Sequence, residues 1–120
     1  MKHSNQRFMK YIIGVLLFII LTDTLHAQNN ANIVSLYNSD STFVGTGLMR
    51  NNLMEGLWKF ENPKTGVLLQ TSNFSNGLRD GTTISYHNGI MKRLEAEYRR
   101  NKLNGPYKEY DIYGNLRLEL

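Results

Sequence analysis

The side chains best suited to acid–base or metal chemistry are scarce after residue 27 of this 120-residue chain. Only one histidine, His87, remains there, and the whole sequence has no cysteine. A lone histidine forms neither a metal site nor a general base without partners. The absence of cysteine excludes thiolate nucleophiles, disulfides and Cys-based zinc sites. We therefore interpret His87 as a solvated turn residue, and the sequence predicts neither a metal nor a cofactor.

Three carboxylates, those of Glu95, Glu97 and Glu109, could supply the acid–base pair of a hydrolase. Glu95 and Glu97 share one strand face with Arg93 and Arg99, which favours an exposed, salt-bridged face over a catalytic pair. The serines lack a G-x-S-x-G elbow. The glycines are spaced by hairpins and do not form a phosphate-binding loop. We therefore predict that the protein is not an enzyme, and a hydrolase is the least favoured function.

Aromatic residues form a better candidate for a functional surface, because Tyr and Trp combine apolar area with a hydrogen-bonding tip. The candidate interaction face consists of Trp58, Phe60, Tyr86, Tyr107 and Tyr110. The alternative is that these rings only pack against one another as the minimal core of a sheet. In a sheet of a single layer both interpretations can hold.

Basic residues are densest in one segment, at Lys92, Arg93, Arg99, Arg100 and Lys102. The glutamates between them favour a solvated edge over the alternative, binding of anions or lipid headgroups. The formal charge of the chain is +4, and without residues 1–27 it is +2, with 11 basic and 9 acidic residues. This charge is too small to indicate a nucleic-acid partner.

Residues 1–27 have the pattern of a signal peptide. Basic residues near the start precede the apolar run 11–21, and Ala27 before Gln28 fits a cleavage site. A spanning helix needs about 20 apolar residues, so an uncleaved anchor is the less favoured alternative. Without a cysteine, lipoprotein attachment is excluded. We expect an exported protein, periplasmic or secreted, whose mature chain does not span the membrane.

One phrase recurs after the leader with a period of 24 to 25 residues. Residues 56–80 and 81–104 are two full copies, 105–120 is a truncated copy, and 33–55 is a degenerate first copy. Such a period indicates a repeat architecture in which each unit is one supersecondary element. We expect one repeat domain, residues 33–120, after a flexible segment, residues 28–32.

Each copy has the composition of a β-hairpin, with short aromatic and β-branched runs between Asn and Gly turn signals. His87-Asn88-Gly89 is the clearest tight turn, and Gly56, Gly81 and Gly105 mark where one hairpin passes into the next. The predicted strands are 33–37, 42–49, 57–61, 67–74, 82–87, 91–99, 106–111 and 115–120. The predicted fold class is all-β, an elongated single-layer antiparallel twisted sheet of tandem hairpins preceded by an N-terminal signal helix.

Equivalent positions of successive hairpins should form ladders along one face. Two residues after the repeat glycine stand Trp58, Thr83 and Tyr107. Five residues after it stand Glu61, Tyr86 and Tyr110, and Phe60 is expected to take the place of Glu61 one position early. This is the basis on which the five aromatic residues are grouped into one face.

The pattern of G-x-W/Y-x-x-Y, a turn glycine and a later Y/F-x-x-G/N-x-x-x-G resembles the MORN repeat. It is most similar to the bacterial variant in antitoxin components of the YwqK type. The match covers residues 37–120, with Asn52 and Asn101 where a turn glycine is usual and Thr83 where an aromatic residue is usual. The resemblance implies open hairpin sheets used as interaction scaffolds, and it implies no reaction.

The final run alternates Leu116, Leu118 and Leu120. This predicts an edge strand with one apolar face that pairs with a second copy or another protein. The leading functional prediction is an exported, non-catalytic MORN-repeat protein that acts as an interaction or scaffold module in the cell envelope. The alternative is an antitoxin or immunity-type inhibitor, for which a periplasmic or secreted target is the more consistent one.

Overall fold

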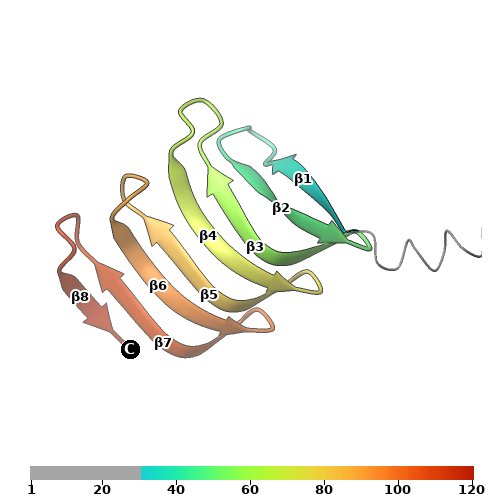
Figure 1. The fold of residues 1–120 in the computed structure, drawn as a ribbon. Helices are drawn as coiled ribbons and strands as arrows, with labels where there is room; N and C mark the ends of the chain where they lie inside the picture. The colour runs from blue at the N-terminus through green and yellow to red at the C-terminus, as the bar shows by residue number, and fades with distance from the viewer. Residues whose placement is uncertain (1–30) are drawn as a thin grey trace, which may run out of the picture. The chain divides into compact units, whose positions relative to one another are not determined.

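The computed structural model describes residues 31–120, so the predicted leader, its cleavage site and the signal helix lie outside the described residues. Residues 31–120 form eight strands and no helix. Their bounds are β1 Ala31–Tyr37, β2 Val44–Arg50, β3 Leu53–Glu61, β4 Leu68–Ser75, β5 Leu78–Tyr86, β6 Lys92–Arg99, β7 Lys102–Tyr110 and β8 Leu116–Glu119. The strands follow chain order in one antiparallel sheet (Figure 1). The predicted all-β antiparallel sheet is confirmed.

Three tight connections join β2 to β3, β4 to β5 and β6 to β7. Their central residues all have positive φ: Asn51 and Asn52, Asn76 and Gly77, Arg100 and Asn101. Two central residues in this conformation define the type I′ turn, whose twist matches that of the flanking strands. Asn52 and Asn101, with φ of 61° and 68°, therefore adopt the left-handed conformation that a turn glycine would adopt.

Longer loops join the strands at the other end of the sheet and use Asn or Asp side chains to hold their backbone. The Oδ1 of Asn62 accepts from the N–H of Lys64, and the Oδ1 of Asn88 accepts from the N–H of Met91. The expected tight turn at His87-Asn88-Gly89 is wrong. The N–H of His87 donates to the carbonyl of Met91, which closes a longer loop in which only Gly89 has positive φ.

The repeat glycines are not the points at which the chain passes between hairpins, and the tight connections take that role. Gly56, Gly81 and Gly105 lie inside β3, β5 and β7, with φ of 67°, 110° and 131°. At each of these glycines the register with the preceding strand shifts. In β4, for example, Ser72 pairs with Thr83 and Phe74 pairs with Arg79, so the part of β5 that contains Gly81 lies opposite a single residue. A glycine relieves the strain of the positive φ there. The three strands consequently begin earlier than predicted.

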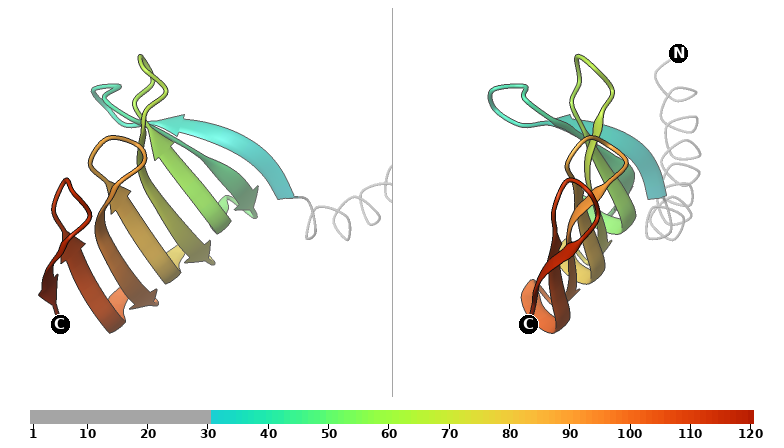
Figure 2. Two further views of the ribbon diagram at one scale, coloured as in Figure 1. Left: turned by 60° about the vertical axis from the view of Figure 1, so that its left-hand side comes forward. Right: turned by 90° about the vertical axis from the view of Figure 1, so that its left-hand side faces the viewer.

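The described residues form a sheet of one layer, and no described element covers either face (Figure 2). A row of directly paired residues crosses its middle, formed by Trp58, Ser72, Thr83, Ala96 and Tyr107. Paired residues of an antiparallel sheet project from the same face. The first four members of the row are buried and Tyr107 is half-buried, so this row takes the place of a conventional core.

Candidate functional site

Four aromatic rings gather on the face of the sheet that carries this central row. Phe60 lies between Phe43 and Trp58, with ring centroids 6.1 Å and 6.4 Å away. Phe74 meets Trp58 edge to face, with centroids 6.4 Å apart and planes at 73°. These spacings are those of favourable aromatic pairs. The four residues, Phe43, Trp58, Phe60 and Phe74, are named the aromatic cluster.

Trp58 is the centre of this cluster and is fully buried. Its Nε1–H donates to the carbonyl of Leu48 at 3.0 Å, so the polar edge of the indole is satisfied. The ring lies over β2, where a Cβ added to Gly47 would come within 2.5 Å of it. A Cβ added to Gly45 would come within 2.7 Å of the Phe60 ring. Two glycines in β2 therefore allow the rings to close over its backbone.

The predicted interaction face is distributed over three places. Trp58 and Phe60 belong to the aromatic cluster. Tyr107 ends the central row and is separated from Trp58 by small side chains, and its hydroxyl donates to Glu109 at 2.5 Å. This hydrogen bond is the main cause that raises the pKa of Tyr107.

The remaining two members, Tyr86 and Tyr110, lie close to Lys92. The pKa of Lys92 is raised mainly by its hydrogen bond to Glu95, with smaller electrostatic contributions from these two tyrosines. In the hairpin of β3 and β4, the position equivalent to Tyr86 and Tyr110 is Glu61. Glu61, Tyr86 and Tyr110 each follow directly after the register shift in the pairing of their own strand with the next one. Phe60 instead pairs with Gln70 and shares a row with Ser85.

Beside the aromatic cluster lies an open groove with a volume of about 290 Å³. Its lining residues are Phe43, Phe60, Leu69, Gln70, Arg79, Ser85 and Arg93. The polar residues on its floor are linked to one another, because the Oγ of Ser85 donates to Gln70 and the amide of Gln70 donates to Ser72. These groups are therefore satisfied without a ligand, and the charge of the groove comes from its two arginines.

Arg79 and Arg93 reach the groove from different strands. The guanidinium of Arg79 lies 5.3 Å from the centre of the Tyr98 ring, a cation–π contact that holds it in place. Neither arginine forms an ion pair with any residue of 31–120. Arginine is well suited to bind a carboxylate through two parallel hydrogen bonds. The groove thus presents two positive groups beside an aromatic wall.

Most of the groove was not identified by sequence reasoning. The sequence pattern places Arg93 on a salt-bridged strand face, and it gives no indication of a role for Arg79. The repeats relate Arg93 to another residue of the groove, Leu69. Leu69, Arg93 and Arg117 occupy equivalent positions, because each is the extra residue at the register shift of its own hairpin. The reach of the Arg79 side chain across the sheet has no equivalent signal in the sequence.

The three glutamates considered as catalytic groups are not brought together. Glu109 pairs with Leu94, while Glu95 follows Leu94 in the strand and projects from the opposite face. Glu97 accepts from the hydroxyl of Thr82 at 2.5 Å. The expected salt bridges with Arg93 and Arg99 are wrong, because the cationic partner of Glu95 is Lys92 at 2.7 Å.

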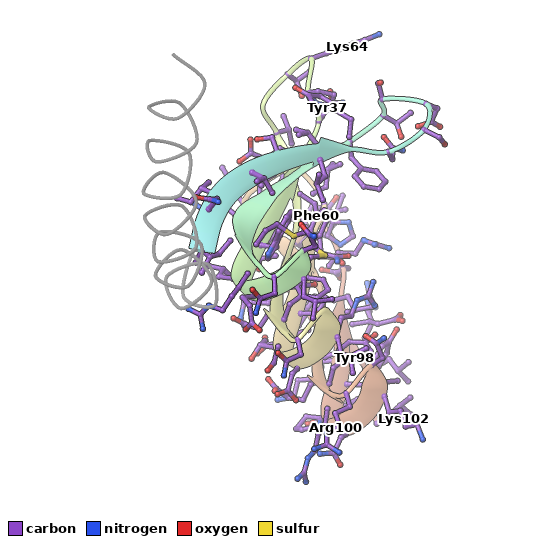
Figure 3. All side chains as sticks on the ribbon, turned by 90° about the vertical axis from the view of Figure 1, so that its right-hand side faces the viewer. Tyr37, Phe60, Lys64, Tyr98, Arg100 and Lys102 are labelled. Atoms are coloured by element: carbon purple, nitrogen blue, oxygen red, sulfur yellow. The ribbon has the colours of Figure 1, made fainter. Side chains whose placement is uncertain are left out.

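The other residues singled out by sequence have structural contacts or project into solvent. The Nε2–H of exposed His87 donates to the carbonyl of Tyr110 at 2.8 Å, which ties one loop to the next hairpin. Figure 3 shows Arg100 and Lys102 at the far end of the sheet from Phe60. Within residues 31–120, no three side chains of the metal-binding types gather into one site.

The last strand does not have the single apolar face that its alternating leucines predict. Tyr110 pairs with Leu116 and the adjacent Glu109 pairs with Leu118, so the two leucines lie on opposite faces. Arg117 is the extra residue between them. Within residues 31–120, β8 pairs with β7 alone, and pairing of its other edge with a further strand stays a prediction.

Comparisons with known proteins identify no relative. No family model matches the chain, and no match was found among curated proteins or solved structures. In the part of the chain that the structure describes, no helix has the length and apolar character needed to cross a membrane.

Proposed function

We propose that the protein is an exported, non-catalytic interaction module of the cell envelope, built from tandem hairpins of the MORN type. The recurrence of tight connections at Asn51, Asn76 and Arg100 supports the repeat origin of the sheet. The register shifts at the glycines of β3, β5 and β7 also recur from hairpin to hairpin, and they support the same repeat origin. Within residues 31–120, no element covers either face of the sheet, as an interaction scaffold requires.

The observation that carries this proposal is the pair of arginines beside the aromatic cluster, neither of which forms an ion pair within residues 31–120. Arg79 and Arg93 offer guanidinium groups for carboxylates, and Phe43 and Phe60 offer apolar surface in the same groove. A partner segment in which acidic residues flank an aromatic or aliphatic side chain would match both features: its carboxylates would meet the arginines, and its apolar side chain would meet the phenylalanines. The groove is open, so it fits an exposed loop or extended segment of another protein.

Binding of short peptides tests the groove directly. We expect a fluorescently labelled peptide with Glu on both sides of Phe to bind, and the same peptide with Lys for Glu not to bind. Arg79→Gln with Arg93→Gln should weaken binding at least about tenfold, since a charge-assisted hydrogen bond contributes about 1.5–3 kcal/mol. Fluorescence anisotropy at low and high salt measures the effect.

The matched control is Arg50→Gln with Arg100→Gln, which removes the same charge from exposed positions outside the groove. Equal weakening by both double variants would show that only the overall charge matters, and absence of peptide binding would remove the groove as a binding site. Capture from an envelope extract with the wild type and the groove variant then identifies the protein partner. A single toxic protein released by the groove variant would establish the inhibitor function in place of the scaffold.

A further inference from the structure

Three Asn-Gly sequences occur in the described part of the chain, at residues 76–77, 88–89 and 104–105. An asparagine can lose its side-chain amide when the nitrogen of the next peptide attacks the side-chain carbonyl carbon. Both groups belong to one chain, so they are held within reach of each other. A following glycine hinders the attack least, since it has no Cβ. The fold decides which of the three asparagines can react.

The first of these sequences is held by its neighbours. Asn76 and Gly77 are the central residues of the tight connection between β4 and β5, where both have positive φ. The N–H of Gly77 donates to the carbonyl of Met54 at 3.0 Å. The N–H of Asn76 donates to Oε1 of Glu55 at 2.9 Å. Attack by the Gly77 nitrogen would break the bond to Met54 and turn the backbone out of this connection.

The third sequence lies inside a strand. Asn104 and Gly105 belong to β7, and both are exposed. Attack closes a ring that includes the bond between Cα and the backbone carbonyl of the asparagine, so the backbone must rotate about that bond. β7 pairs with β6 at Leu103 and again at Tyr107. Pairing on both sides of Asn104 therefore restricts the rotation that the reaction needs.

The second sequence lies in the exposed loop between β5 and β6. Oδ1 of Asn88 accepts from the N–H groups of Ile90 and Met91, at 3.3 Å and 3.0 Å. Gly89 lies between Asn88 and these donors, so the side-chain carbonyl is held over the peptide that contains the Gly89 nitrogen. The Gly89 N–H donates to no group of residues 31–120. The attacking nitrogen therefore has no hydrogen bond to give up.

We propose that Asn88 is a site of spontaneous deamidation. The Gly89 nitrogen bonds to Cγ of Asn88, and the bond from Cγ to Nδ2 breaks. Ammonia leaves with the proton that the Gly89 nitrogen loses, and a cyclic imide remains. Water then adds to either carbonyl of the imide and opens it to aspartate or isoaspartate. Negative charge develops on Oδ1 during the attack, and the N–H groups of Ile90 and Met91 already point at that atom.

The other long loops provide comparisons within the same chain. Asn62 holds the β3–β4 loop in the same manner, since its Oδ1 accepts from the N–H groups two and three residues later, at 2.9 Å and 3.3 Å. The next residue is Pro63, whose nitrogen has no hydrogen to lose. In the β7–β8 loop this role belongs to Asp111, which has no amide. Of these three loops, only that of Asn88 combines a hydrogen-bonded amide with a following N–H.

Either product changes the loop. Aspartate adds a negative charge, and isoaspartate also lengthens the backbone between positions 88 and 89. The N–H of His87 closes the loop on the carbonyl of Met91, and the His87 ring is hydrogen-bonded to the carbonyl of Tyr110. A longer backbone strains both contacts. None of residues 87–91 lines the groove, so this inference stands independently of the proposed function.

Peptide mapping by mass spectrometry tests the assignment on protein aged at mildly alkaline pH. In the folded protein we expect Asn88 to convert at least about tenfold faster than Asn76 and Asn104. In concentrated urea the three should convert at similar rates, because each is followed by glycine and the fold no longer distinguishes them. Asn88→Ser should abolish the fast release of ammonia that the folded wild type shows.

Pro63→Gly tests the loop itself, because it gives Asn62 a following N–H. We expect Asn62 to convert at least about tenfold faster in this variant than in wild type. Pro63→Ala is the matched control, since its Cβ hinders the attack on Asn62. It should therefore convert more slowly than Pro63→Gly. Circular dichroism verifies that each variant folds.

Three results would overturn the proposal. Equal conversion of the three asparagines in the folded protein would show that the fold selects no site. Slower conversion of Asn88 than of Asn76 or Asn104 would place the reactive site elsewhere. A folded Pro63→Gly variant in which Asn62 stays intact would show that the hydrogen-bonded loop does not support the reaction.

Discussion

Trp58 is fully buried although no second layer of the described residues covers it. Its burial comes from the rings of Phe60 and Phe74, from close approach to the β2 backbone at Gly47, and from the hydrogen bond to Leu48. Such a side chain contributes to stability before it contributes to binding. Among the predicted recognition residues, Trp58 has the contacts of a core residue, while Phe60 also faces the groove.

Gly47→Ala should destabilise the fold, because the new Cβ would come within 2.5 Å of the Trp58 ring. Overpacking of this kind costs about 1–3 kcal/mol. Urea unfolding followed by fluorescence measures it well, since Trp58 is the only tryptophan of the chain. Thr46→Ala, an exposed neighbouring change, should stay within about 0.5 kcal/mol. Equal stability of Gly47→Ala and wild type would show that Trp58 does not pack on β2.

At the scale of the element, Asn or Asp side chains hold the backbone of the longer loops. In the β7–β8 loop, Oδ1 of Asp111 accepts from the N–H groups of Asn115 and Tyr113, both at 2.9 Å. Its Oδ2 lies 2.8 Å from Arg117. The hydrogen bond from the Asn115 backbone is the main cause that lowers the pKa of Asp111 below 3.8. The negative charge therefore stabilises this loop.

The Asp111 carboxylate should stabilise the protein above pH 3.8 and lose that effect as the pH falls through its lower folded pKa. Asp111→Asn should therefore be less stable than wild type near neutral pH, and the difference should shrink in acid. Urea midpoints over this pH range measure it, and carboxyl NMR locates the titration. A midpoint for Asp111 at or above 3.8 would contradict the structure, and Asp80→Asn provides an exposed carboxylate as control.

The whole sheet is assembled by pairing each strand with its neighbours in sequence. Consecutive pairing makes the contacts of the described residues local in sequence, as in other serial architectures. Stability should therefore vary along the sheet. β4 and β5 have neighbours on both sides and carry the buried residues Ser72, Thr83 and Ser85, whereas β1 and β8 are edges.

Native-state hydrogen exchange should reveal this gradient. We expect the slowest exchange in amides of β4 and β5 and the fastest in β1 and β8, because edge strands open without disturbing the centre. Uniform protection across all eight strands would instead indicate a single cooperative unit.

Much of the architecture was predictable from local sequence. Alternating apolar runs and Asn-Gly signals predicted eight strands in one antiparallel sheet. The error over Gly56, Gly81 and Gly105 has a physical reason, since a glycine with positive φ occurs in turns and in strand irregularities alike. The same ambiguity explains the error at His87-Asn88-Gly89, because local composition does not fix the length of a hairpin loop.

The sequence by itself determined the strand pattern and the scarcity of groups for catalysis, because these depend on residue types and their spacing. Only the tertiary structure decided which side chains meet. Trp58 became a core residue because Gly47 admits its ring, and Arg79 and Arg93 came to share a groove because strand register and side-chain reach bring them together. Those contacts depend on neighbours distant in sequence, so the periodicity along the chain does not predict them.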